Sequence, residues 1–216
     1  MNEELELFRE NVKRFVDQEI VRHYEQWEKD EIFPRQLWNK LGEHGLLAVD
    51  TPEQYGGIGA DFLFSMVIQE VFAHANCGAV GGPMAVHSDI VVHYLLNHGT
   101  ERQKQQYLPK MVAGACVGAL AMTEPGAGSD LQGVKTTAKR DGDDYIINGS
   151  KTFITNGQHC DMVIVVARTN PEVSGSKGTT LFIVETDTPG FQRGRTLEKI
   201  GLHASDTSEL FFQDVR

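Results

Sequence analysis

Apolar residues recur at helical spacing through the first half of the chain. Residues 3–29 place an apolar side chain at every third to fifth position, with charged residues between them: Leu5, Phe8, Val12, Phe15, Ile20, Tyr24 and Trp27. This pattern is typical of a long amphipathic helix that packs on other helices. Further helices are predicted from Pro34 to about Gly45 and over residues 61–75, 84–96 and 100–111. The first half is therefore predicted to be entirely helical.

After Cys116 the pattern changes to short β-type runs, over residues 117–123, 134–140, 145–148, 151–155, 161–167, 179–185 and 207–215. Asp141-Gly142 and Asn148-Gly149 each separate two such runs. Both dipeptides favour the type I′ turn of a β-hairpin, so they predict a meander. Regular turns without intervening helices favour a small barrel or sandwich and exclude a parallel βαβ sheet.

These patterns together predict an α+β multidomain protein. An N-terminal all-α helical domain would occupy residues 1–115, and a small antiparallel β-barrel or sandwich domain would follow over residues 116–216, with the boundary near residues 113–117. A length of 216 residues with 40% apolar content is enough for two real cores. Residues 169–178 are rich in Ser, Gly and Pro and predict an exposed loop.

Charge and cysteine content exclude several classes of function. The chain has 20 basic and 30 acidic residues, a net charge of -10, which argues against nucleic acid or an anionic membrane as the main ligand. No apolar run is long enough for a membrane span. Cys77, Cys116 and Cys160 fit no zinc or redox spacing, so free buried thiols are expected and no metal site is predicted. Met1 leads directly into an acidic helical pattern, which favours a cytoplasmic location.

Residues 120–130, Leu-Ala-Met-Thr-Glu-Pro-Gly-Ala-Gly-Ser-Asp, concentrate hydroxyls, carboxylates and glycines on one connector. Glycines let backbone N–H groups approach a phosphate, and Pro125 stiffens the turn, so a nucleotide cofactor fits. Taken alone, such a run is more often an ordinary loop. It is not the dinucleotide motif, because Leu131 stands where a third glycine is needed, and it lacks the Lys and Ser/Thr of a P-loop.

The same string resembles the first motif of the acyl-CoA dehydrogenase family. A second family block follows at residues 148–157, Asn-Gly-Ser-Lys-Thr-Phe-Ile-Thr-Asn-Gly, and a third at residues 199–207 with 211–215. The sequence around these blocks, including His87-Ser88 and Asn97-His98-Gly99, is most similar to the long-chain-specific branch. The resemblance covers essentially all 216 residues. It implies a helical domain, a β domain and a C-terminal helical bundle, so we expect this chain to be an N-terminal portion without the bundle.

The resemblance also implies an FAD site on the β domain. The cofactor-binding residues carried over are Leu120, Ala121, Met122, Thr123, Ser129, Phe153, Ile154 and Thr155, and the acyl-CoA-binding residues are Ser129, Lys177 and Gly178. Without the resemblance, Thr123 and Thr155 would be ordinary strand threonines and Lys177 a solvated loop lysine. Phe153 stands where many relatives carry Trp, and Leu120 where several carry an aromatic residue.

No catalytic residue is predicted within the chain. Glu124 has the chemistry of a base for α-proton abstraction, but the family's base is a glutamate of the absent C-terminal domain, so Glu124 is expected to shape its turn. His87 and His93 are six residues apart and do not form a metal site on one helical face.

The function implied is an FAD-dependent acyl-CoA dehydrogenase that oxidises fatty acyl-CoA to trans-2-enoyl-CoA and passes electrons to electron-transfer flavoprotein. The fragment alone is expected to be inactive, and the full-length enzyme is expected to be a homotetramer or homodimer. Two alternatives stay open. One is a flavin monooxygenase or oxidase of the same fold, and the other is a non-catalytic binding fragment.

Overall fold

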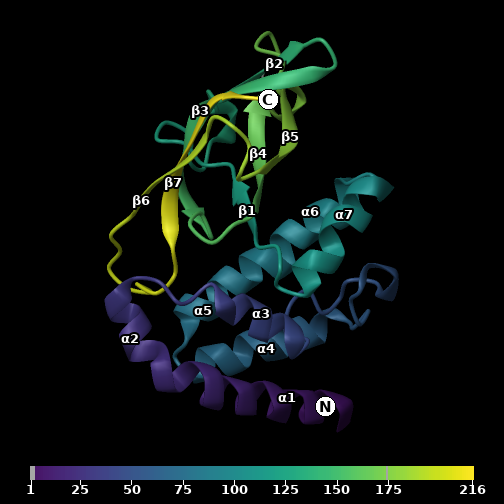
Figure 1. Ribbon diagram of the computed structural model, residues 1–216, viewed down its shortest axis with the longest axis vertical. Coiled ribbons are helices and arrows are strands. Elements are labelled where there is room, and N and C mark those ends of the chain that lie inside the picture. Colours follow the sequence, from purple (N-terminus) through teal and green to yellow (C-terminus); the bar gives the residue numbers. More distant parts are fainter. Residues whose placement is uncertain (1–2, 174) are drawn as a thin grey trace. The chain divides into compact units, whose positions relative to one another are not determined.

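The computed structural model describes residues 3–173 and 175–216. The chain divides into a helical unit, Met1–Val117 with Glu198–Ser205, and a β unit, Gly118–Leu197 with Asp206–Arg216. Figure 1 shows the helices in purple to teal and the strands in teal to yellow. The first passage from one unit to the other falls at Val117, next to the boundary that the sequence pattern indicates. The return of residues 198–205 to the helical unit has no counterpart in that pattern.

The helical unit confirms the helical character of the first half. Its α-helices are α1 (Glu3–Phe15), α2 (Arg22–Asp30), α3 (Gln36–Glu43), α4 (Phe62–His74), α5 (Gly78–Ala85), α6 (Val92–His98) and α7 (Glu101–Val112). Two π-helical turns, Val16–Val21 and Val86–Val91, join α1 to α2 and α5 to α6. None of the helices in the described part of the chain is both long enough and apolar enough to cross a bilayer.

Helix ends and burial follow from specific side chains. The Asp61 carboxylate accepts a hydrogen bond from Leu63 N at 2.8 Å and caps α4, while Thr100 and Gln103 form a capping box at the start of α7. The helix predicted from residue 84 begins earlier, at Gly78. Gly and Pro at positions 81–83 lower helix propensity, but burial of Ala79, Val80 and Met84 outweighs that local preference.

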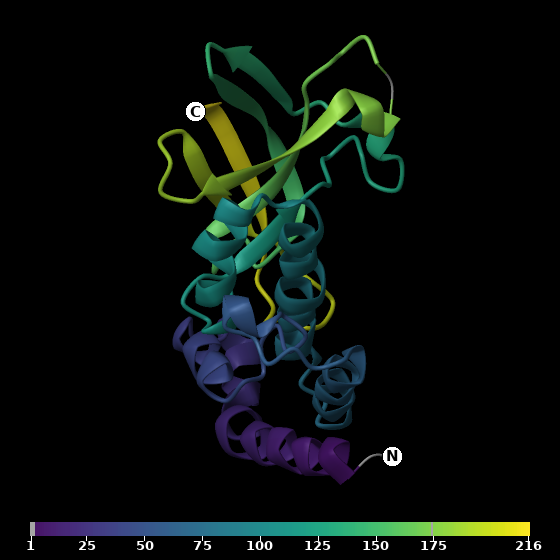
Figure 2. The ribbon, with the colours of Figure 1, turned by 90° about the vertical axis from the view of Figure 1, so that its right-hand side faces the viewer.

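The β unit is a single curled sheet of mostly antiparallel strands. Its strands are β1 (Gly118–Ala121), β2 (Thr137–Asp141), β3 (Asp144–Thr155), β4 (Met162–Arg168), β5 (Thr179–Glu185), β6 (Phe191–Thr196) and β7 (Thr207–Val215). The order is β1-β4-β2-β3-β7-β6, and β5 pairs with the other side of β4. Figure 2 shows the twist of these strands in teal to yellow. A helical first half followed by a small β domain is therefore confirmed.

Three details of the sheet differ from the sequence-based expectation. β1 runs parallel to β4, with Gly118 opposite Met162, rather than antiparallel. β6 was not predicted because its residues, Phe-Gln-Arg-Gly-Arg-Thr, are mostly polar and partly exposed. Finally, Asn148-Gly149 does not turn the chain, because β3 continues through it.

Gly149 is required because β3 closely approaches Thr136, the residue before β2. The φ of Gly149 is +153°, and a Cβ at this position would lie 2.7 Å from the Cβ of Thr136, which is far inside van der Waals contact. The pairing of β3 with β7 also shifts register between Ile147 and Gly149, as a β-bulge does. The true hairpin turn is at Gly142, whose φ is +65°.

Adding one methyl group at Gly149 should therefore destabilise the β unit. We expect Gly149→Ala to lower its free energy of unfolding by about 2–4 kcal/mol, because backbone strain and overpacking add. Gly142→Ala is the matched control, since Gly142 also has a positive φ but no atom of the described chain lies within 4 Å of the added Cβ. Urea unfolding of both variants measures the difference, and equal losses would contradict the close-approach explanation.

Candidate functional site

The two sequence blocks singled out above lie side by side in the β unit. The first block leaves the end of β1, and the second forms the last part of β3. Thr152 N donates a hydrogen bond to Thr123 O at 2.9 Å, and Lys151 Nζ donates one to Met122 O at 2.9 Å. Segments far apart in the sequence therefore share one surface.

Phe153 stands out on this surface because a bulge displays it. The pairing with β7 changes from Lys151 opposite Leu210 to Ile154 opposite Ser208, so β3 contains one extra residue there. Phe153 has a φ of +58° and is 66% exposed. The left-handed conformation costs an aromatic residue about 1–2 kcal/mol, and such strain is concentrated at functional sites. A ring held outward in this way is suited to pack against a planar ligand.

The other residues predicted from the two blocks fall into two groups. Ala121 and Ile154 are buried in the core of the β unit, so only their backbone could meet a ligand. Leu120, Met122, Thr123 and Thr155 are half-buried at the surface. The N–H of Thr123 has no hydrogen-bond partner among the described residues, whereas its carbonyl is occupied by Thr152.

A cavity of about 630 Å³ lies in the β unit beside the first block. It brings together three of the predicted residues, Met122, Ser129 and Lys177. Gly178 supports the wall behind Lys177, since it is buried and a Cβ on it would overlap the Val173 carbonyl. Lys177 and Ser129 are both exposed and therefore accessible to a polar ligand.

Arg168 connects the two segments that form the walls of this cavity. The sequence did not predict this role. Its guanidinium donates to the carbonyls of Gln132 at 2.6 Å, Val134 at 3.2 Å and Val173 at 3.2 Å. These carbonyls belong to the segments that carry the Ser129 and Lys177 sides of the cavity. An arginine at the end of a strand gives no sign in the sequence that it bonds backbone carbonyls of distant loops.

Glu124 and Lys151 form a buried ion pair beneath the surface. Lys151 Nζ lies 2.9 Å from Glu124 Oε1, and the two side chains are 0% and 5% exposed. The carboxylate also accepts hydrogen bonds from Lys135 N at 2.7 Å and Thr136 N at 2.9 Å. Burial raises the pKa of Glu124, but hydrogen bonds from Thr136, Lys135 and Lys151 outweigh this, so its pKa is lowered. Glu124 is thus ionised, fully engaged and unsuited to act as a base.

The sequence did not predict that Lys151 is a buried residue that supports this surface. Burial lowers the pKa of its ammonium group, while the Glu124 carboxylate opposes that change. The one available sign was a lysine between β-type residues, which on its own indicates a solvent-facing position.

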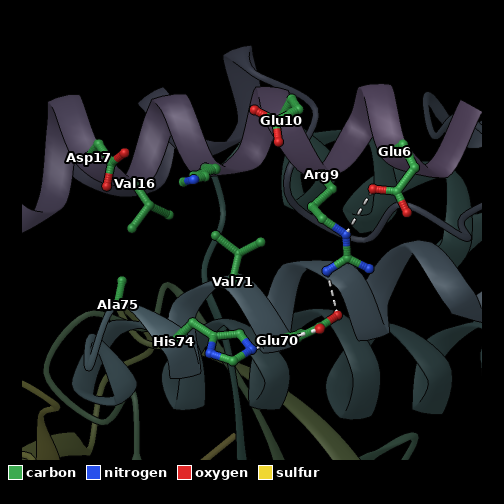
Figure 3. A pocket seen from close by; sticks show the side chains of 10 residues that line it. Glu6, Arg9, Glu10, Val16, Asp17, Glu70, Val71, His74 and Ala75 are labelled. Carbon is green, nitrogen blue, oxygen red and sulfur yellow. Dashed lines mark hydrogen bonds and ion pairs between the residues drawn. The ribbon is translucent and has the colours of Figure 1, made fainter.

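The helical unit has a cavity of its own, about 510 Å³ in volume, between α1 and α4. Figure 3 shows Arg9 reaching from α1 to Glu6 and to Glu70 of α4. Glu10 and Asp17 add two further carboxylates to its lining. An excess of negative charge opposes a phosphate-bearing ligand, and none of the predicted site residues lies there. The β unit is the better candidate for a nucleotide site.

Two models of known protein families match this chain, one over the helical part and one over the β part. The family model described as "Acyl-CoA dehydrogenase, N-terminal domain" matches residues 2–115, and the one described as "Acyl-CoA dehydrogenase, middle domain" matches residues 119–215. A curated relative, the mitochondrial long-chain specific acyl-CoA dehydrogenase of Sus scrofa, is 52% identical over 214 residues, which are 99% of this chain and 49% of that protein.

Solved structures show the same similarity. An acyl-CoA dehydrogenase from Geobacillus kaustophilus is 50% identical with a TM-score of 0.95, over 100% of this chain and 56% of the other. A glutaryl-CoA dehydrogenase from Mycobacterium smegmatis, solved in complex with FADH2, is 31% identical with a TM-score of 0.91, over 100% and 54%.

The chain spans about half the length of the curated relatives that it matches. Within that span, the two family models follow each other in order and cover nearly every residue. The chain belongs to the acyl-CoA dehydrogenase family, whose members are flavin-dependent oxidoreductases.

Proposed function

We propose that this chain supplies the helical and flavin-binding parts of an FAD-dependent acyl-CoA dehydrogenase that acts on long-chain fatty acyl-CoA. The observation that carries the proposal is the shared surface of the two blocks. There, an aromatic ring is held outward at Phe153 and the Thr123 N–H has no partner among the described residues. The 52% identity to a long-chain specific relative supports the substrate class.

The residues of this surface fit a flavin. Among the described residues, Gly126 and Gly128 have no atoms within 4 Å of where a Cβ would lie, so the loop leaves open space beside its backbone. Thr123 and Thr155 would donate hydrogen bonds to the flavin ring, and Phe153 would pack against it. A bound flavin would supply the acceptor for the hydride that leaves the β-carbon of the acyl thioester. Donors fixed in advance by a rigid sheet would stabilise the negative charge that builds up on the ring.

Substrate binding would use the cavity beside the first block. Lys177 offers a positive charge to a CoA phosphate, and Ser129 offers a hydroxyl to the pyrophosphate of the cofactor or to the thioester arm of the substrate. Arg168 would keep these two segments at a fixed separation through its bonds to Gln132 and Val173.

The base that removes the α-proton would lie outside this chain. Glu124 cannot serve, because the Lys151 ammonium and two backbone N–H groups hold its carboxylate. The product would be trans-2-enoyl-CoA, with electrons passing to electron-transfer flavoprotein. A homotetramer or homodimer is proposed for the longer enzyme.

The chain on its own should therefore bind FAD weakly and show no turnover. Titration of FAD followed by flavin fluorescence should give saturable binding, since the ring-facing half of the site is already formed. No palmitoyl-CoA-dependent dye reduction is expected. Dye reduction that disappears on denaturation would disprove the placement of the base, and absence of any FAD binding would disprove the flavin site. Rapid oxygen consumption by the reduced complex would favour a flavin oxidase instead.

Single substitutions should separate the ring contacts from the phosphate contacts. Thr123→Ala and Thr155→Ala should each weaken FAD binding by about 1–3 kcal/mol, which is roughly a 5- to 150-fold rise in Kd, because each removes one side-chain hydroxyl that would donate to the ring, while the backbone N–H groups stay. Both should also shift the bound flavin's absorbance spectrum. Ser129→Ala should weaken binding while leaving that spectrum close to the parent.

The matched control is Thr180→Ala. Thr180 is an exposed strand threonine of β5 whose hydroxyl bonds to that of Thr169. This substitution should leave both FAD affinity and spectrum unchanged. If Thr123→Ala, Thr155→Ala and Ser129→Ala behave like this control, the three residues are ordinary strand and loop residues.

A further inference from the structure

The Lys151–Glu124 ion pair lies at the point where the two blocks meet, and stability alone does not explain it. Removing two charges from water costs free energy, and well-packed apolar residues of similar volume are often equally stable in such places. We propose that this ion pair is a positioning device, which orients the Thr123 N–H and the Phe153 ring toward the flavin. The inference deepens the proposed function and rests on it.

Lys151 orients the peptide group between Met122 and Thr123. Lys151 Nζ holds the Met122 carbonyl at 2.9 Å and so fixes the direction of the peptide that joins Met122 to Thr123. This peptide is trans, and a trans peptide points its C=O and N–H in opposite directions. The Thr123 N–H is therefore turned away from buried Lys151. The next carbonyl, that of Thr123, is held by Thr152 N, so the N–H between these two carbonyls is the group left for a ligand.

Lys151 also anchors β3 directly beside its bulge. Lys151 is the last residue of β3 in register before the extra residue, and its buried side chain ties β3 to the first block at that point. In a strand of regular alternation, residues 151 and 153 would share one face. The bulge instead places Lys151 inside and Phe153 outside. Anchoring Lys151 thus favours the register in which Phe153 faces the ligand.

The Lys151–Glu124 ion pair also holds the loop that carries Ser129, the residue proposed to contact a phosphate. The Glu124 carboxylate accepts bonds from Lys135 N and Thr136 N, so it closes the loop of residues 125–134, which carries Ser129. One buried pair therefore connects the ring-facing edge, the bulge and the loop that lines the cavity. A ligand that contacts all three would depend on it.

Two variants distinguish positioning from simple stabilisation. Lys151→Met keeps the apolar stem but loses the bonds to Met122 O and Glu124. Lys151→Met/Glu124→Gln also removes the carboxylate charge, so no unpaired buried charge is left. If the pair only stabilised the fold, recovery of stability in the double variant would restore flavin binding. A positioning pair predicts that flavin binding stays weak, because Met122 O still lacks its donor.

The experiment uses the full 216-residue chain with FAD. Kd is measured by flavin fluorescence, the bound spectrum and reduction potential by spectroelectrochemistry, and stability by urea unfolding. We expect Kd to rise at least tenfold and the spectrum to shift in both Lys151→Met and the double variant, with the double variant closer to the parent in stability. The control is Lys139→Met, an exposed lysine of β2, which should match the parent throughout.

Each other outcome has a definite meaning. Parent-like Kd and spectrum in a folded Lys151→Met, or restoration of both in the double variant, would overturn the positioning role and leave the proposed function intact. No FAD binding by the parent would overturn the proposed function, and this inference with it. Should both variants fail to fold, amide exchange in the parent decides. FAD should slow exchange of the Thr123 N–H at least tenfold, and an unchanged rate would refute the inference.

Discussion

The parallel pairing of β1 with β4 is the constraint on which the candidate site depends. Four residues of β1, from Gly118 to Ala121, are in register with Met162 to Val165, and three of the four are buried. Because β1 is so short and so enclosed, the chain emerges at Met122 in a fixed direction. Ligands commonly bind where parallel strands end at their carboxyl side, and the glycine-containing loop begins at such an end. The loop therefore starts from the end of a paired and mostly buried strand.

Local rules of sequence predicted the elements better than they predicted the site. Helical period identified the helices, and Asp141-Gly142 identified the β2–β3 turn correctly. Asn148-Gly149 has the same chemistry as that turn but lies inside β3, because the glycine is needed for contact with Thr136 rather than for reversal. Residues 198–205 carry no periodic pattern. Their place in the helical unit depends on His203 N and Ala204 N bonding to Glu28, a contact between residues too distant for any sequence window.

Residue types indicated the chemistry of the site, but not how the site is held. The resemblance pointed to Thr123, Phe153 and Thr155, which lie on neighbouring segments of the β unit. The supporting groups were invisible, because a buried lysine and a carbonyl-binding arginine look like solvated residues in a sequence. Several local preferences are broken within this small region, including positive φ at Phe153 and Asn156 and buried charges at Lys151 and Glu124. The apolar core around Val163 and Val165 must offset these costs, which is the usual arrangement where a fold builds a ligand surface.

The three cysteines of the folded chain are expected to react slowly with thiol reagents. All are buried, and burial raises the pKa of Cys160 to about 12 and that of Cys77 to about 11. Thiolate is the reactive form of cysteine, so at neutral pH these two thiols are both shielded and protonated. A thiol introduced at an exposed position such as Phe153 would therefore be the preferred target of a maleimide dye. The native chain already provides the low background that fluorescence labelling needs.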